Sequence, residues 1–67
     1  MHKEEFARIL SENRKLNNLT QKELAEKTGF TVRAIQYWEK GTKNISLENA
    51  DKLLKALGVE VEIGSLL

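Results

Sequence analysis

The segment from Val32 to Lys40 carries on one face a set of side chains whose chemistry suits the edges of nucleic-acid bases. Successive residues of a helix are about 100° apart. The side chains of this face therefore lie within roughly 140° of the helix surface, and they are Val32, Arg33, Gln36, Tyr37 and Lys40. A valine methyl suits a thymine methyl, a guanidinium suits guanine O6 and N7, and an amide suits adenine N6 and N7. The phenol can reach a phosphate or a base edge. A face that only meets solvent is usually richer in glutamate and lysine, so this one predicts base readout in double-stranded DNA.

The opposite face of the same segment is apolar and is predicted to lie on a core. Ala34, Ile35 and Trp38 recur there at helical spacing, and Thr31 is placed to cap the first turn. Gly41 can take the left-handed conformation that ends a helix. The segment is therefore predicted to be an amphipathic helix.

A second short helix is predicted directly before it. Thr20 and Glu23 have the spacing of a capping box, and Gly29 should stop this helix after about Thr28. Ala25 is small enough to let the next helix approach closely. About three residues around the glycine separate the two helices, which favours a helix-turn-helix over a plain helical hairpin in a small bundle.

Two further helices, at residues 3–16 and 47–57, flank this pair. Ser46 is placed to cap the second of them, and the Asn13 amide is expected to be hydrogen-bonded at the polar margin of the core. Their apolar stripes consist of Phe6, Ile9, Leu10, Leu16, Leu47, Ala50, Leu53, Leu54 and Leu57. We therefore predict an all-α fold, a compact bundle of four or five short helices that contains the helix-turn-helix.

In the C-terminal segment the spacing of apolar residues changes from helical to strictly alternating. Val59, Val61 and Ile63 alternate with glutamates, which describes a half-buried strand that has no partner in an otherwise helical chain. We expect residues 59–67 to pair with a second copy and form a homodimer. The alternative is a frayed tail.

Length and composition exclude several classes of protein. The 67 residues should form one domain, residues 1–67, and they include no cysteine and only one histidine, His2. Neither a metal site, a cofactor nor an enzyme active site is indicated. No apolar run or signal peptide is recognisable, so a cytoplasmic protein that does not contact membranes is expected.

The net charge of +1 is small for a protein that meets phosphates, but the charge is unevenly spread. Formal charges are +1 over residues 1–20, +2 over residues 21–45 and −2 over residues 46–67. The first two thirds of the chain should therefore provide any surface that faces DNA.

The sequence resembles the lambda-repressor-like helix-turn-helix domains of the Xre and Cro type over nearly its whole length. The resemblance is ungapped from Leu19 to Val59. It rests on Leu19, Thr20, Gln21, Leu24, Ala25, Gly29, Ile35, Glu39, Gly41, Ser46, Leu47, Glu48, Ala56, Leu57, Gly58 and Val59. The chain departs from the family pattern at Ile45, where many members have proline, and at Trp38, where a smaller apolar residue is common.

The resemblance implies particular contacts with DNA. Val32, Arg33 and Tyr37 fall on base-contacting positions, and Gln36 is a weaker candidate for the same contact. Residues on positions expected to meet the sugar-phosphate backbone are Gln21, Thr31, Lys40, Lys43 and Asn44, and Gln21 is also expected to brace the second helix of the motif. Arg33 could instead meet a phosphate, and the Tyr37 ring could pack at the edge of the core.

The resemblance also implies a structural ion pair between Arg14 and Glu39, joining the first helix to the third. The function it implies is a transcription regulator, a repressor that binds a palindromic operator as a dimer. The alternative is an antitoxin that binds a toxin protein and regulates its own operon.

Overall fold

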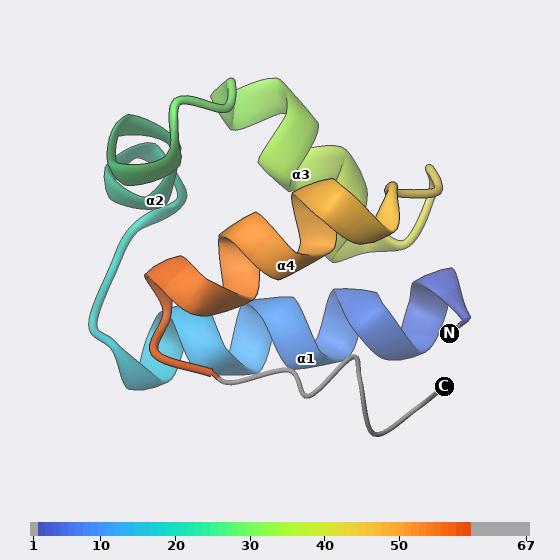
Figure 1. The fold of residues 1–67 in the computed structure, drawn as a ribbon, viewed down its shortest axis with the longest axis horizontal. Coiled ribbons are helices and arrows are strands. Elements are labelled where there is room, and N and C mark those ends of the chain that lie inside the picture. Colours follow the sequence, from blue (N-terminus) through green and yellow to red (C-terminus); the bar gives the residue numbers. More distant parts are fainter. Residues whose placement is uncertain (1, 60–67) are drawn as a thin grey trace.

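The computed structural model describes residues 2–59 and contains four helices in that range. They are α1 (Lys3–Leu16), α2 (Gln21–Thr28), α3 (Val32–Lys40) and α4 (Leu47–Ala56). Figure 1 shows α2 and α3 in the upper part of the view, with α4 and then α1 below them. The predicted all-α class is confirmed, and all four predicted helices are present. No helix in residues 2–59 is long and apolar enough to span a bilayer.

The predicted caps begin three of these helices. Thr20 Oγ1 accepts a hydrogen bond from the Glu23 N–H at 3.0 Å, and the Thr20 N–H donates to Glu23 Oε1 at 2.9 Å, so both halves of the capping box are formed. The backbone donor at Thr20 lowers the pKa of Glu23. Thr31 accepts from the Ala34 N–H at 3.0 Å, and Ser46 caps α4 in the same way. Local side-chain chemistry therefore sets where α2, α3 and α4 begin.

One apolar core joins the four helices. Leu10, Leu24, Ile35 and Leu53 are completely buried at its centre. The core also contains Phe6, Ala25, Ala50, Leu54 and Leu57. The small side chain of Ala25, on α2, is buried in this core, as expected for a position where another helix approaches closely.

Two residues of the predicted apolar stripes lie outside the core. Leu16 is 77% exposed and Leu47 is 60% exposed. They are the last residue of α1 and the first of α4, where each stripe continues past the helices that cover it. Trp38 is half-buried rather than central, and its ring packs edge-on against Phe30 with centroids 5.1 Å apart.

Polar side chains close the margin of the core. Asn13 Nδ2 donates to the Ile9 carbonyl at 2.8 Å, which confirms the expected hydrogen bond. Asn17 Nδ2 donates to the Leu57 carbonyl at 3.1 Å and so joins the end of α1 to the end of α4. The predicted strand lies almost entirely outside the described residues. Only Val59 is described, and it is half-buried with irregular backbone.

Two glycines stop the helices of the helix-turn-helix in the left-handed conformation, but their surroundings differ. Gly29 has φ 82° and open space where a side chain would begin. Gly41 has φ 71°, and a Cβ there would lie 3.3 Å from Glu4 Cα at the start of α1. The end of α3 therefore packs directly on the backbone of α1.

This difference predicts unequal effects of the same substitution. Gly29→Ala should cost about 1 kcal/mol of unfolding free energy, because the left-handed conformation strains an L-residue. Gly41→Ala should cost about 2 kcal/mol, because the contact with Glu4 adds to that strain. Urea unfolding followed by circular dichroism measures both, with Gly29→Ala as the matched control. Equal losses would contradict the close packing at Gly41.

Candidate nucleic-acid interface

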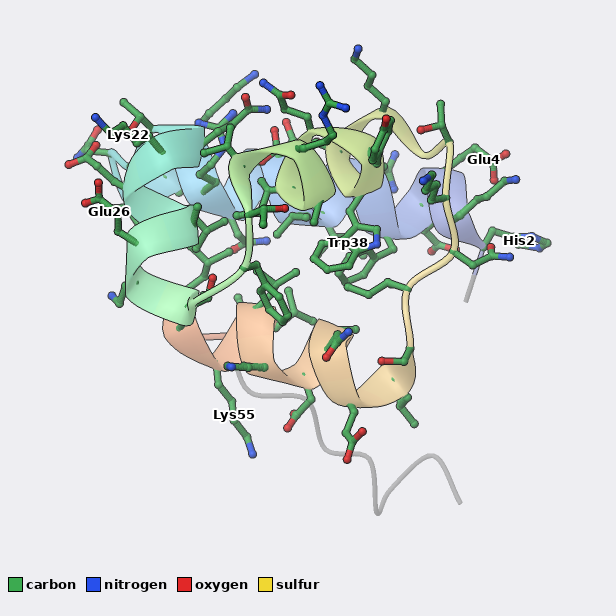
Figure 2. All side chains as sticks on the ribbon, turned by 90° about the horizontal axis from the view of Figure 1, so that it is seen from above. His2, Glu4, Lys22, Glu26, Trp38 and Lys55 are labelled. Atoms are coloured by element: carbon green, nitrogen blue, oxygen red, sulfur yellow. The ribbon has the colours of Figure 1, made fainter. Side chains whose placement is uncertain are left out.

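The outer face of α3 is the largest set of predicted contact residues that the structure brings together. Arg33, Gln36 and Lys40 are exposed, whereas Val32 and Tyr37 are half-buried. Val32 also packs against the core, so its methyl groups are only partly available. Figure 2 looks down on α2 and α3 and shows the Trp38 ring on the side of α3 that faces α4. The face of α3 that carries Arg33 and Gln36 is exposed and does not form part of the core.

Tyr37 is held by the loop that follows α3. Lys43 Nζ lies 4.2 Å from the centre of the Tyr37 ring, a cation–π contact. The Thr42 N–H and hydroxyl both donate to the Tyr37 carbonyl, at 3.2 and 3.3 Å. The loop that carries Lys43 and Asn44 is thereby tied to the end of the exposed face of α3.

An open pocket forms where this loop meets α3. It is lined by Thr31, Arg33, Ala34, Tyr37, Trp38, Lys43 and Asn44. The lining includes two cations and no carboxylate, which suits an anionic partner such as a phosphate. Lys43 and Asn44 are exposed at this pocket, and Lys40, the last residue of α3, is exposed as well. Thr31 accepts the capping hydrogen bond, which leaves its own hydroxyl hydrogen free to donate.

Arg14 of α1 and Glu39 of α3 form a nearly buried ion pair. Arg14 Nε and Nη2 donate to the two Glu39 carboxylate oxygens at 2.7 and 3.0 Å, and their side chains are only 12% and 8% exposed. Arg14 Nη1 also donates to the Leu19 carbonyl at 2.8 Å. The hydrogen bonds to Glu39, followed by its charge, raise the pKa of Arg14. The pair joins α1 and α3 to the turn that precedes α2.

Gln21 extends this polar cluster to the surface. Its Nε2 donates to Glu39 Oε1 at 3.2 Å, and its Oε1 accepts a long hydrogen bond of 3.5 Å from Gln36 Nε2. The sequence does not identify Gln36 as a residue of α3 that Gln21 contacts, nor Lys43 as the residue that covers Tyr37. Each contact joins residues of two different elements. The spacing of residues within one helix does not indicate such contacts.

The predicted dimerisation residues are described at one position only. The Val59 N–H donates to the Leu54 carbonyl at 2.8 Å, a bond that closes the end of α4. Val61 and Ile63 lie outside the described residues. The proposed pairing of these residues is therefore an expectation from their alternation.

Fold and interface together define the class of protein: a DNA-binding regulator built on a helix-turn-helix, with α3 as the exposed second helix of the motif. A sequence profile described as helix-turn-helix matches residues 10–63, so the chain belongs to the helix-turn-helix family. This match confirms the resemblance to lambda-repressor-like domains.

Three proteins of known sequence are similar to this chain. The chain is 45% identical over 49 residues to an uncharacterized HTH-type transcriptional regulator of Methanocaldococcus jannaschii, covering 73% of this chain and 74% of that protein. A regulator described in the same words from Methanothermobacter thermautotrophicus is 44% identical over 52 residues, 78% and 75% of the two chains. The control protein C.BamHI of Bacillus amyloliquefaciens is 41% identical over 44 residues, 66% and 54% of the two chains. No solved structure gives a significant match.

Proposed function

We propose that this chain represses transcription by occupying a palindromic operator as a dimer. The observation that carries the proposal is the outer face of α3, which turns Arg33 and Gln36 to solvent while Ile35 anchors the opposite face in the core. The second helix of such a motif lies in the major groove with its exposed side chains on base edges. The base contacts would come from Val32, Arg33, Gln36 and Tyr37.

Contacts with the DNA backbone would surround this face. Lys40, Lys43 and Asn44 rim the outer end of α3, and Thr31 and Gln21 lie at the N-terminal ends of α3 and α2. Helix N-termini and lysines are common partners of phosphate oxygens. Backbone contacts on both sides of α3 would set its register in the groove.

The net charge of +1 supports action in pairs. A monomer with so little excess positive charge attracts DNA weakly, whereas two copies double the number of phosphate contacts. Two α3 helices related by a two-fold axis would meet successive major grooves about 34 Å apart. Val59, Val61 and Ile63 would provide the pairing strand. Sedimentation as a monomer, both free and on DNA, would refute the dimer.

Selection of bound sequences from a random pool of DNA duplexes tests the function directly. We expect an enriched sequence with two inverted half-sites about one helical turn apart. Recovery of unrelated sequences would contradict specific binding, and a single unrepeated half-site would contradict the symmetric dimer. None of the three relatives above is named as an antitoxin. The regulator is therefore the function that we propose.

Two alanine substitutions should separate base contacts from phosphate contacts. Arg33→Ala should weaken operator binding by about 1 to 3 kcal/mol and relax the preference at one base pair. Lys43→Ala should weaken binding to all sequences alike and reduce the slope of log affinity against log salt by about one. Fluorescence-anisotropy titrations on operator and random duplexes at several salt concentrations measure both effects. The assignment is wrong if both variants act equally on the two duplexes.

A further inference from the structure

The indole N–H of Trp38 is a hydrogen-bond donor that has no partner within residues 2–59. The side-chain hydrogen bonds around it, at Thr31, Gln36 and Thr42, all involve other groups. No side-chain nitrogen or oxygen in the described part of the chain is both sealed from solvent and unpaired. The Trp38 N–H must therefore reach space that solvent can enter. A tryptophan that is largely packed usually places this donor against an acceptor.

The ring that carries this donor is held in place. Trp38 packs edge-on against Phe30, with ring centroids 5.1 Å apart and ring planes at 87°. Phe30 is itself covered by Lys52 of α4, whose Nζ lies 5.0 Å from the centre of the Phe30 ring. The Trp38 ring also packs against the apolar core. A donor on a ring held in this way loses little conformational entropy when it meets an acceptor.

The space beside Trp38 is the open pocket between α3 and the loop that follows it, with a volume of about 400 Å³. Other donors line the same pocket: the Thr31 hydroxyl, the Lys43 ammonium and the Asn44 amide. No carboxylate lines it. A lining rich in donors and in positive charge suits a group with several acceptor oxygens and a negative charge, and a backbone phosphate of DNA has both.

The position of Trp38 on its helix favours a phosphate over a base. Trp38 and Gln36 are two residues apart in α3, which places them roughly 160° apart around the helix. When the face with Gln36 meets the base edges, Trp38 is turned toward the side of the groove. The sugar-phosphate backbone forms that side.

We infer that Trp38 donates its indole N–H to one backbone phosphate of the operator, which lies in the open pocket beside Thr31, Lys43 and Asn44. This inference rests on the proposed function. It gives Trp38 a contact that the smaller apolar residue common at this position in lambda-repressor-like domains cannot make. The contact is a neutral one, whereas Lys43 supplies charge to the same pocket.

Two changes remove the donor and keep an aromatic ring in its place. Trp38→Phe keeps an aromatic partner for Phe30 but is smaller. A chemically synthesised chain in which benzothiophene replaces the Trp38 indole keeps the bicyclic size and exchanges only the N–H for sulfur. Thermal unfolding followed by circular dichroism gives a temperature at which every chain is folded. Fluorescence anisotropy on labelled duplexes then measures binding at several salt concentrations.

We expect both changes to weaken binding about tenfold per half-site, on operator and random duplexes alike, because a hydrogen bond to a charged oxygen is lost. The slope of log affinity against log salt should stay at the wild-type value, since the indole carries no charge and releases no counterion. Lys43→Ala is the matched comparison, because it should reduce the same slope by about one.

A set of modified duplexes locates the contact. In each duplex a neutral methylphosphonate replaces a single backbone phosphate, and the wild-type chain should lose affinity wherever it contacts the phosphate replaced. Both Trp38 changes should reduce this loss by about threefold or more at one phosphate in each half-site, because the two partners of one bond are not additive. The losses at all other phosphates should stay at their wild-type values.

Two results would overturn the inference and leave the proposed function standing. One is a benzothiophene chain that binds the operator as tightly as the wild-type chain. The other is a loss of affinity that is not linked to any single phosphate, which would give Trp38 a packing role only. A wild-type chain that binds no duplex would overturn both the inference and the proposed function.

Discussion

Glu39→Ala is expected to reduce the free energy of unfolding by about 3 to 5 kcal/mol. The substitution leaves the Arg14 guanidinium, 12% exposed, without its carboxylate and removes the hydrogen bonds that Arg14 of α1 and Gln21 of α2 donate to α3. Small domains are typically stable by about 5 to 15 kcal/mol, so the loss approaches the whole stability of a short chain. Urea unfolding followed by circular dichroism, with wild type and variant side by side, measures it.

A second ion pair provides the matched control. Asp51 and Lys55 are one turn apart on α4, with the ammonium 3.0 Å from the carboxylate and the lysine side chain 69% exposed. Asp51→Ala should cost less than about 0.5 kcal/mol, because the lysine of this pair is largely exposed and water screens its charge. If the two substitutions had similar effects, the buried geometry of Arg14 and Glu39 would not be a principal support of the fold.

Ile35→Ala should cost about 2 to 5 kcal/mol, the second large effect. Ile35 is completely buried and is the only residue of α3 that lies fully in the core. Its truncation would leave a cavity where α3 meets the rest of the bundle. Ile35→Val should cost only about 0.5 to 1.5 kcal/mol, because one methylene group is lost. Denaturant midpoints of the two variants give the comparison.

Leu47→Ala is the control for the core substitution. Leu47 is 60% exposed at the first position of α4, so its truncation should change stability by less than about 0.5 kcal/mol. A loss at Leu47 as large as the loss at Ile35 would mean that the apolar stripe of α4 is buried to its first residue. That result would restore the arrangement expected from periodicity alone.

Helix boundaries could be predicted because their signals are local. The capping box at Thr20 and Glu23, the cap at Thr31 and the left-handed Gly29 and Gly41 each act within one or two turns of chain. The boundaries of α1, α2 and α3 agree with the expectation, and α4 ends one residue earlier, at Ala56. Capping chemistry and glycine placement therefore determine the bounds of α2 and α3 and the start of α4.

Contacts between elements could not be predicted in the same way. Periodicity places Leu16 on an apolar stripe, but only the crossing of the helices decides that it is 77% exposed. The meeting of Gln21 with Gln36 depends on side-chain conformations on two helices. The pairing expected for Val59 to Ile63 requires a second chain, which one sequence cannot supply. Packing geometry therefore determines the finer features of the interface.

The chain contains one tryptophan, and its location makes it a natural optical probe. Trp38 packs edge-on against Phe30 in the turn between α2 and α3, and it lines the same open pocket as Arg33 and Tyr37. Unfolding would move the indole from a half-buried site into water and shift its emission to longer wavelength. A DNA duplex that covers the pocket would also change the Trp38 emission while the protein remains folded. A single unlabelled spectrum could thus follow folding and DNA docking together.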